Sequence, residues 1–201
     1  MPWISTDELL GARCPLCKGP LDQSGICSRC EAAMRPRRRG NLIYLGSYRE
    51  LKYIVRRLKY RGGSKLVEPL ARLLAAGVVE AGWQIDGVTA VPTLWWRSLL
   101  RGYNPAEVLA RAIARQLSIK YFRVLGRRYS PSQTRRARDM RASLRPGTFF
   151  VRRGELPLRR WLLVDDVWTT GGTFRAVERA LRGAGAEAVF GAVIAASEKP
   201  L

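Results

Sequence analysis

The sequence contains no histidine, and it has only 16 acidic residues against 36 lysines and arginines. The absence of histidine excludes Ser-His and Cys-His nucleophilic pairs and histidine-ligated metal sites. The formal net charge of +20 and the pI of about 11.1 favour polyanionic partners, such as nucleic acid, phosphorylated metabolites or anionic lipid. The alternative, an arginine-rich surface that is merely solvated, is disfavoured by so high a pI.

Long apolar runs are also missing from the sequence. A membrane-spanning helix needs about 20 apolar residues, and no run approaches that length. The first residues lack the charged and apolar regions of a secretory signal. We therefore expect a cytoplasmic protein, which a partner could still recruit to the inner face of the membrane. A chain of 201 residues with 47% hydrophobic content fits one core plus a small appendage.

The stretch from residue 161 to residue 183 has the most informative pattern. Leu162 to Val164 form a continuous apolar run that predicts a buried parallel strand, with Asp165 and Asp166 at its end. A helical pattern from Phe174 to Arg182 follows and ends at Gly183. Between the acids and the helix lie small, hydrogen-bonding residues: Thr169, Thr170, Gly171, Gly172 and Thr173.

This order of residues matches the needs of a phosphorylated sugar. Glycines allow close approach of the backbone, and the unpaired amides at a helix start bind phosphate. The two acids suit hydroxyl groups, or a hydrated divalent cation, beside that phosphate. A ribose 5-phosphate carries both kinds of group. The alternative is an ordinary strand-loop-helix corner with an N-capping Asp or Thr.

The stretch from Val164 to Thr173 resembles the phosphoribosyl-pyrophosphate (PRPP) motif of type I phosphoribosyltransferases. The resemblance implies that Asp165 and Asp166 hold the ribose hydroxyls and that Thr169 to Thr173 hold the 5-phosphate. It also implies Mg²⁺ as the companion of PRPP. Binding of PRPP does not establish catalysis, and no catalytic residue is assigned.

Four cysteines form two C-x-x-C pairs near the N-terminus, separated by nine residues. Four thiolates at this spacing predict a closed, structural, tetrahedral zinc site. Two disulfides are the alternative, which a cytoplasmic setting disfavours. Whether the module is only a scaffold or also contacts nucleic acid or a protein stays open. The predicted ligands are Cys14, Cys17, Cys27 and Cys30.

The basic segment from Arg35 to Arg39 is interpreted as a linker. It divides the chain into a zinc-binding four-cysteine module with its basic linker, residues 1–38, and a phosphoribosyltransferase-like domain, residues 39–201. The same arginines could lie along a phosphate backbone or form a solvated hinge.

The pattern from Glu50 to Tyr60 predicts an amphipathic helix whose polar face is basic and aromatic. Basic residues beside aromatic rings suit single-stranded nucleic acid, because bases stack while the backbone is neutralised. A surface helix with a core stripe is an equally open interpretation. A second helix is expected from Leu66 to Glu80, with Pro69 in its first turn. The nucleic-acid candidates on the first helix are Arg56, Arg57 and Lys59.

Strands are expected at 87–91, 122–125 and 188–194, with an edge strand at 149–151. Alternation of these strands with helices predicts an α/β fold, in which a mostly parallel sheet carries helices on both faces and ligands bind at the carboxyl ends of the strands.

The loop after the strand at 87–91 forms a second strand-loop-helix corner. Asn104 is expected to cap a helix that has Pro105 at its first position and ends near Gln116. The candidates for contact with pyrophosphate in this loop are Arg97, Arg101 and Gly102.

Residues 127–147 are rich in arginine and too polar for the core. Phosphoribosyltransferases carry a mobile loop at this place in the chain order. Its arginines could clamp pyrophosphate or a DNA backbone, and we favour DNA. An exposed arginine-rich helix is the alternative. The nucleic-acid candidates here are Arg135, Arg136, Arg138 and Arg141.

Several motifs occur in the order typical of the ComF family, and the four-cysteine module precedes them. They are Leu58-Lys-Tyr-Arg-Gly62, Ala90-Val-Pro92, Arg97, Arg101-Gly-Tyr-Asn104 and the PRPP-like motif. This resemblance, which covers nearly the whole chain, implies a type I phosphoribosyltransferase-like fold and a role in natural transformation, where single-stranded DNA is handled after uptake. It also implies helicase-like DNA-uptake or recombination proteins as partners.

Two functions therefore compete. The first is handling of single-stranded DNA in natural transformation, with a PRPP-type binding site on the same protein. The second is an active, Mg²⁺-dependent phosphoribosyltransferase that transfers phosphoribose from PRPP to a nitrogen nucleophile.

Overall fold

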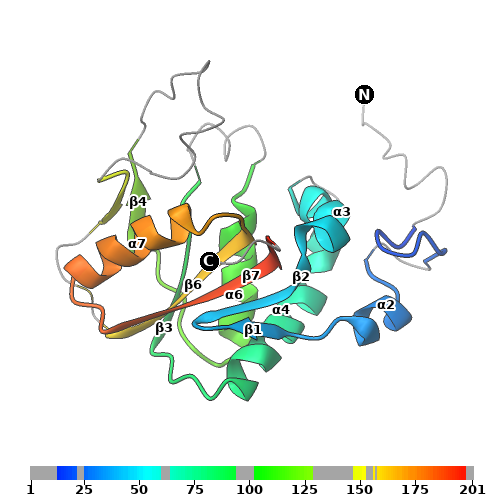
Figure 1. Cartoon of the computed structure of the whole chain (residues 1–201), viewed down its shortest axis with the longest axis horizontal. Helices are drawn as coiled ribbons and strands as arrows, with labels where there is room; N and C mark the ends of the chain where they lie inside the picture. The colour runs from blue at the N-terminus through cyan, green and yellow to red at the C-terminus, as the bar shows by residue number, and fades with distance from the viewer. Residues whose placement is uncertain are drawn as a thin grey trace.

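A five-stranded sheet forms the centre of the computed structural model, which describes residues 13–21, 25–59, 64–93, 102–128, 147–152, 156 and 158–197 (Figure 1). The strand order is β1-β2-β7-β6-β3. β2, β7, β6 and β3 run parallel, and β1 is antiparallel to β2. The mostly parallel sheet is therefore confirmed. The strands are β1 Arg37–Arg39, β2 Leu42–Ser47, β3 Gly87–Ala90, β6 Arg160–Trp168 and β7 Ala188–Ala196.

Helices cover both faces of this sheet, as the alternating pattern predicts (Figure 1). Three helices pack on one face, and α7 packs on the other. A short helix, α2, begins directly after Cys27, contains Cys30 and has no buried residue. The helices are α2 Ser28–Ala33, α3 Tyr48–Leu58, α4 Ser64–Glu80, α6 Pro105–Gln116 and α7 Gly172–Gly183.

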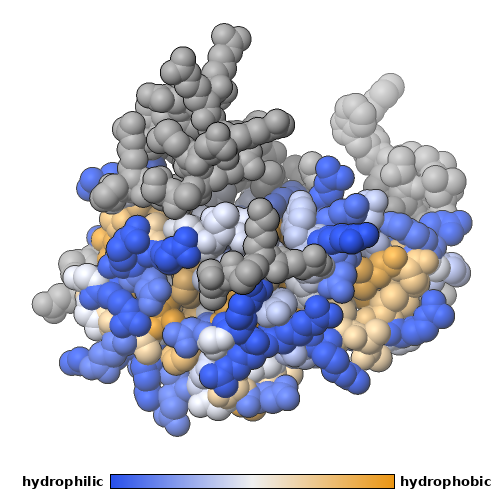
Figure 2. Space-filling model, in the orientation of Figure 1, coloured by the Kyte–Doolittle hydropathy of each residue, from blue (hydrophilic) through white to orange (hydrophobic). Residues whose placement is uncertain are grey.

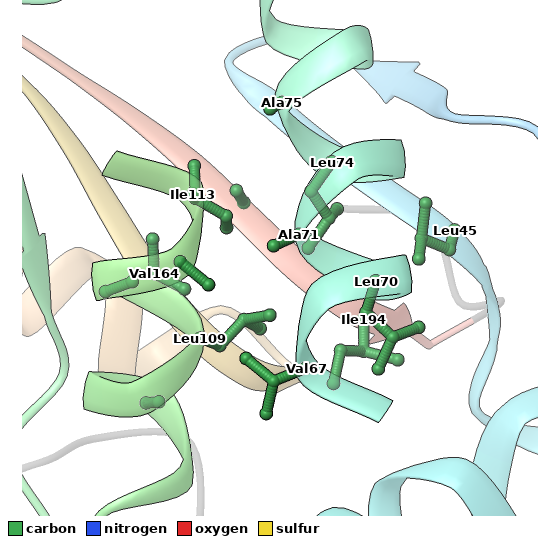
Figure 3. Packing of buried hydrophobic residues seen from close by; sticks show 14 of the residues in the cluster. Leu45, Val67, Leu70, Ala71, Leu74, Ala75, Leu109, Ile113, Val164 and Ile194 are labelled. Carbon is green, nitrogen blue, oxygen red and sulfur yellow. The ribbon is translucent and has the colours of Figure 1, made fainter. Parts of the chain in front are cut away.

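β6 has apolar side chains on both faces, because each face is covered by helices. Leu162 and Val164 belong to the core beneath α4 and α6, where Val164 and Ile194 lie among leucines of those helices (Figure 3). Trp161 and Leu163 belong to the core beneath α7. The continuous apolar run was therefore a correct indication of a strand buried on two sides.

Two helix starts follow from local capping. The Asn104 side chain accepts a hydrogen bond from the Ala106 amide at 3.2 Å, and Pro105 occupies the first position of α6. α6 thus begins and ends as the sequence predicts. At α3, Ser47 and Glu50 form a reciprocal capping box, so the helix begins at Tyr48 rather than at Glu50.

Two sequence predictions about secondary structure were wrong. α4 begins at Ser64, so Pro69 lies inside the helix rather than in its first turn. The strand expected at 122–125 is β4, Leu125–Arg127, and it pairs only with β5, Phe149–Val151, in a separate antiparallel sheet. The edge strand expected at 149–151 is confirmed as β5, an edge of this small sheet. The chain leaves the main sheet after a single bridge between Tyr121 and Val88.

The interpretation of Arg35 to Arg39 as a linker was also wrong. Arg37–Arg39 form β1, whose partners in β2 are Tyr44, Ile43 and Leu42. β1 extends across the expected boundary between residues 38 and 39, because the backbone of these arginines completes the edge of the sheet. The division into two domains itself stays a prediction.

Hydrophilic side chains cover much of the described surface on the face shown in Figure 2, with smaller hydrophobic areas between them. Of the helices in the described part of the chain, none combines the length and the apolar character that crossing a bilayer requires.

Candidate functional site

The two acids of the PRPP-like motif lie near the carboxyl end of β6, but inside the strand. β6 continues to Trp168, so the expectation that Asp165 and Asp166 follow the strand was wrong. The pairing of β6 with β7 continues through Asp165, Val167 and Trp168, which extends the strand past the acids. Alternation along a strand then points the two carboxylates to opposite faces. We call Asp165, Asp166 and the turn 169–173 the acidic corner.

Asp166 faces α3 and has a cationic partner there. Its Oδ2 lies 2.6 Å from the Nζ of Lys59, the residue that caps the C-terminus of α3. The two side chains are 18% and 32% exposed, so this pair is better shielded from solvent than most surface ion pairs. The basic end of α3 is therefore joined to the acidic corner.

Asp165 faces the α7 side of the sheet, beside Val193 and Phe174. Burial raises the pKa of Asp165 well above its ordinary value, and the neighbouring charge of Asp166 raises it further. The Asp165 Oδ1 accepts a hydrogen bond from the Asp166 amide at 2.8 Å, which opposes these two effects. One carboxylate of the pair is thus paired with a cation, and the other has a raised pKa.

The turn after β6 exposes the groups that a phosphate needs. Thr169 and Thr170 are exposed, and Gly172 begins α7, whose first amides have no partner within the helix. Gly171 has φ of +72°, and a Cβ there would lie 2.6 Å from the Trp168 ring. Only glycine therefore fits this position without strain.

The space beneath this turn is small. A cavity of about 20 Å³, lined by Asp165, Thr173 and the rings of Trp168 and Phe174, holds about one water molecule. The two rings pack with centroids 4.8 Å apart. A phosphate group therefore fits against the exposed side of the turn and not inside the cavity.

The loop predicted to contact pyrophosphate is only partly described. Arg97 and Arg101 lie outside the described residues, whereas Gly102 lines a cavity of about 690 Å³ beside α6. The hydroxyl of Tyr103 donates a hydrogen bond to the Leu58 carbonyl at 2.5 Å. The end of α3 therefore contacts this loop as well as the acidic corner.

The four cysteines come together as their spacing predicts. Their sulfur atoms all lie within 4.8 Å of one another, and Cys17 Sγ lies 3.7 Å from Cys27 Sγ. A tetrahedral site with Zn–S bonds of about 2.3 Å requires sulfur atoms about 3.8 Å apart. No disulfide joins these four residues. The cluster therefore fits a tetrahedral metal ion.

The four thiols differ in their electrostatic environments. A hydrogen bond from the Gly19 backbone lowers the pKa of Cys17 to about 6. Burial raises the pKa of Cys30 to about 12, and the Cys27 thiol adds to that rise. A bound metal ion would hold all four as thiolates. Arg29, which hydrogen-bonds to the Cys17 sulfur, would offset part of the resulting negative charge.

The cysteine module is attached to the helices of the main core. Arg57 Nη1 on α3 donates to the Arg13 carbonyl at 3.1 Å, and Arg72 on α4 pairs with Glu31 at 2.7 Å. Met34 is buried in the core beneath α3 and α4. The module is thus fixed against the same helix that ends at the acidic corner.

The nucleic-acid candidates of α3 have different surroundings. Arg56 is exposed, whereas Arg57 and Lys59 have the partners described above. The ring of Tyr53, on the same helix, is exposed. Its centre lies 4.2 Å from Lys18 Nζ and 5.1 Å from Lys52 Nζ. We call Lys18, Lys52, Tyr53 and Arg56 the basic-aromatic patch. The second group of candidates, Arg135, Arg136, Arg138 and Arg141, lies outside the described residues.

Comparisons with known proteins agree with this architecture. The phosphoribosyl transferase domain family matches residues 104–200. Competence protein F of Haemophilus influenzae is 29% identical over 214 aligned positions, covering 88% of this chain and 93% of that protein. DNA utilization protein YhgH of Escherichia coli K12 is 30% identical over 200 positions, covering 92% of this chain and 82% of that protein.

The chain belongs to the ComF family. The resemblance expected from its motifs is therefore confirmed, and with it the type I phosphoribosyltransferase-like fold. A solved structure of glutamine PRPP amidotransferase from B. subtilis, complexed with ADP and GMP, is 22% identical with a TM-score of 0.46. That match covers 69% of this chain and 30% of the amidotransferase chain. The family match and the sheet topology together define the fold of this ComF-family protein.

Replacement of Asp165 by asparagine is expected to stabilise the protein at neutral and alkaline pH. Because the pKa of Asp165 is raised, the stability that its protonation provides is present at acidic pH and is lost as pH rises through the folded-state pKa. The asparagine amide that replaces the acid has no charge to desolvate. In urea unfolding experiments, the free energy of unfolding of Asp165→Asn should therefore exceed that of the parent by an amount that increases with pH.

Asp86→Asn provides a control of opposite sign. Hydrogen bonds from Arg160 lower the pKa of Asp86, with Nη2 2.6 Å from Oδ1, so this carboxylate contributes stability above its unfolded-state pKa. Its replacement should destabilise the protein at neutral pH and have little effect in acid. If both substitutions changed the free energy of unfolding equally and independently of pH, the raised pKa of Asp165 would be contradicted.

Proposed function

We propose that this ComF-family protein handles single-stranded DNA during DNA uptake in natural transformation, and that its acidic corner binds PRPP or a related phosphoribosyl ligand. The observation that carries the proposal is the ion pair between Lys59 and Asp166. It joins α3, which bears the basic-aromatic patch, to the acidic corner.

The names of the relatives support the DNA role. They describe competence in Haemophilus influenzae and DNA utilization in Escherichia coli, and they do not favour the alternative of an active Mg²⁺-dependent phosphoribosyltransferase. Helicase-like DNA-uptake proteins or recombination proteins are the partners that such a role implies. The protein would then act in the cytoplasm, where a DNA-uptake partner could recruit it to the inner face of the membrane.

The basic-aromatic patch offers what single-stranded DNA requires. Tyr53 is 46% exposed, and the centre of its ring lies 4.2 Å from Lys18 Nζ of the cysteine module and 5.1 Å from Lys52 Nζ of α3. A base stacked on such a ring contributes about 1–3 kcal/mol, and the lysines neutralise the phosphates on either side. Arg56 lies one turn further along the same helix and extends the positive surface.

The acidic corner and the DNA surface share Lys59. A ribose hydroxyl that donates to Asp166 competes with the Lys59 ammonium for the same oxygen. Release of Lys59 from Asp166 would leave its ammonium charge unpaired at the end of α3, next to the proposed DNA surface. Bound PRPP would in this way change DNA affinity, and by linkage bound DNA would change PRPP affinity by the same factor. Mg²⁺ would accompany PRPP and neutralise its pyrophosphate.

We assign zinc to the four-cysteine cluster, because its sulfur spacing fits a tetrahedral ion and all four donors are thiols. The ion would be structural, since four protein ligands leave no open position. The proposed division is a zinc module of residues 1–38 and a phosphoribosyltransferase-like domain of residues 39–201. The contacts of the module with α3 and α4 give the zinc ion a role in positioning the DNA surface.

DNA binding is tested with the triple substitution Lys18→Gln, Lys52→Gln and Arg56→Gln. The slope of log affinity against log salt is negative, and each lost phosphate contact should reduce its magnitude by about 0.7. The triple variant should therefore have a slope about 2 smaller in magnitude than the parent. Fluorescence anisotropy with a labelled single-stranded oligonucleotide, between about 50 and 200 mM salt, measures the slope.

The matched control removes the same charge elsewhere, at Arg115, Arg159 and Arg182, which pair with glutamates on other surfaces. This control should leave the slope close to that of the parent. Tyr53→Leu should weaken binding by roughly tenfold without changing the slope, because it removes stacking but no charge. Equal losses in both triple variants would show that net charge alone drives binding and would contradict the patch.

Binding of PRPP is tested by calorimetric titration with Mg²⁺ at mildly alkaline pH, where Asp165 is more fully ionised. Asp165→Asn is expected to weaken binding by roughly 10- to 100-fold, because a hydrogen bond to a charged group contributes about 1.5–3 kcal/mol. Repetition with oligonucleotide-saturated protein measures the coupling. Absence of PRPP binding to folded, metal-loaded protein would refute the ligand site and leave the DNA proposal standing.

Zinc is tested by elemental analysis of protein purified without added metal, with one zinc ion per chain expected. A chelator should remove the ion and lower the melting temperature, since the module that it holds packs against α3 and α4. Cys17→Ser should have the same effect, whereas Ser28→Ala, beside the cluster but without a sulfur ligand, should retain the zinc. Iron or a disulfide in place of zinc would overturn the assignment.

A further inference from the structure

A second concave site lies beside α6. It encloses about 690 Å³ between the end of β3, the first turns of α6, the strand β4 and Arg152, which follows β5. Its lining shares no residue with the small cavity beneath the PRPP-like turn. The volume falls in the range of pockets that bind small organic ligands. This cavity is therefore large enough for a single nucleotide.

The charged residues that line this cavity are mostly basic. Among the described lining residues there are four arginines and one acid, Glu107, so these residues carry a formal charge of +3. A concave surface with this excess of guanidinium groups attracts an anion, and guanidinium matches phosphate oxygens in a bidentate manner. The four arginines are Arg111, Arg123, Arg127 and Arg152.

Arg111 forms a planar platform at the wall of the cavity. Its guanidinium carbon lies 4.3 Å from the centre of the Tyr121 ring, and Glu107 Oε1 accepts hydrogen bonds from its Nε at 3.3 Å and its Nη2 at 2.8 Å. The side chain remains 52% exposed. A guanidinium held by a ring on one side and by a carboxylate at its edge offers its other face for stacking with a nucleobase.

Thr89 adds an unsatisfied polar group to the same lining. This residue is 1% exposed, and its Oγ1 has no hydrogen-bond partner among the described residues. A buried polar atom without a partner destabilises the fold, and that cost is recovered when a ligand supplies the partner. The position thus identifies a place where a hydroxyl, amine or carbonyl of a ligand would be held.

We propose that this cavity binds one nucleotide. The nucleobase stacks on Arg111, the phosphate contacts the remaining arginines, and a polar group of the ligand hydrogen-bonds to Thr89. The nucleotide is either a free nucleoside monophosphate or one unit of a single-stranded DNA chain, because both have a nucleobase, a sugar and a phosphate. The proposal involves no residue of the acidic corner, but Gly102, a candidate for contact with pyrophosphate, lines the same cavity.

The experiment is a calorimetric titration of the zinc-loaded full chain with dAMP, with deoxyadenosine and with inorganic phosphate. dAMP should bind at least about tenfold more tightly than either fragment, because only dAMP satisfies the platform and the arginines together. Thr89→Val and Arg111→Met should each weaken dAMP binding by roughly fivefold or more. Arg115→Met, one turn away on α6 and outside the cavity, should leave dAMP binding unchanged.

Thr89→Val also separates a binding role from a structural one. Valine has nearly the same shape, and it replaces a hydroxyl that has no partner among the described residues, so the melting temperature should stay equal or rise. A fall in dAMP affinity without a fall in stability supports the proposal. A large loss of stability in Thr89→Val would instead show that the hydroxyl has a structural partner, and would overturn it.

Asp165→Asn decides which site binds the nucleotide. If dAMP affinity is lost in Asp165→Asn and retained in Thr89→Val, the nucleotide occupies the acidic corner and the proposal is wrong. Chemical cross-linking and light scattering test the other occupant, a second copy of the chain that covers the cavity. A dimer joined through this face, with no dAMP bound, would also overturn the proposal.

A second titration distinguishes the two sources of the nucleotide. A short single-stranded oligonucleotide of deoxyadenosine is compared with dAMP in the parent and in Thr89→Val. Weakened binding of the oligonucleotide identifies DNA as the source, and an effect confined to dAMP identifies a free nucleotide. Affinity for both probes that is unchanged in Thr89→Val would refute the site.

Discussion

The burial of β6 on both faces is the constraint on which the rest of the structure depends. Because Leu162, Leu163 and Val164 alternate between two helical layers, the sheet requires α4 and α6 on one side and α7 on the other. The same alternation continues into Asp165 and Asp166 and points them to different layers. Two adjacent acids therefore acquire different partners, a cation for one and a largely apolar pocket for the other.

α3 connects the functional parts of the molecule. Its N-terminus is fixed by a capping box, its middle carries the exposed Tyr53 ring, and its C-terminus contacts both Asp166 and the loop before α6. The cysteine module is attached to the same helix by a hydrogen bond from Arg57. A helix of 11 residues spans about 16 Å, so the cysteine cluster, the basic-aromatic patch and the acidic corner are connected by one short, rigid element.

Sequence reasoning succeeded where the determinants are local. The cap at Asn104, the turn at Gly171 and the sulfur spacing of the cysteine pairs each depend on residues within a few positions of one another. It failed where distant segments meet. No periodicity shows that Lys59 reaches Asp166 or that Tyr121 lies beneath Arg111. The sequence pattern also does not indicate that a run of arginines forms a sheet edge, because β1 pairs with β2 through backbone groups and its side chains stay polar.

That arginine edge has a consequence for the behaviour of the molecule in solution. A sheet edge presents unpaired backbone groups that another copy of the chain can use to extend the sheet. In this protein the edge strand consists of Arg37, Arg38 and Arg39, so an approaching second edge would bring like charges together. Under the proposed function, copies of the protein would gather on a DNA strand at high local concentration, and the charge of this edge would oppose their pairing edge to edge.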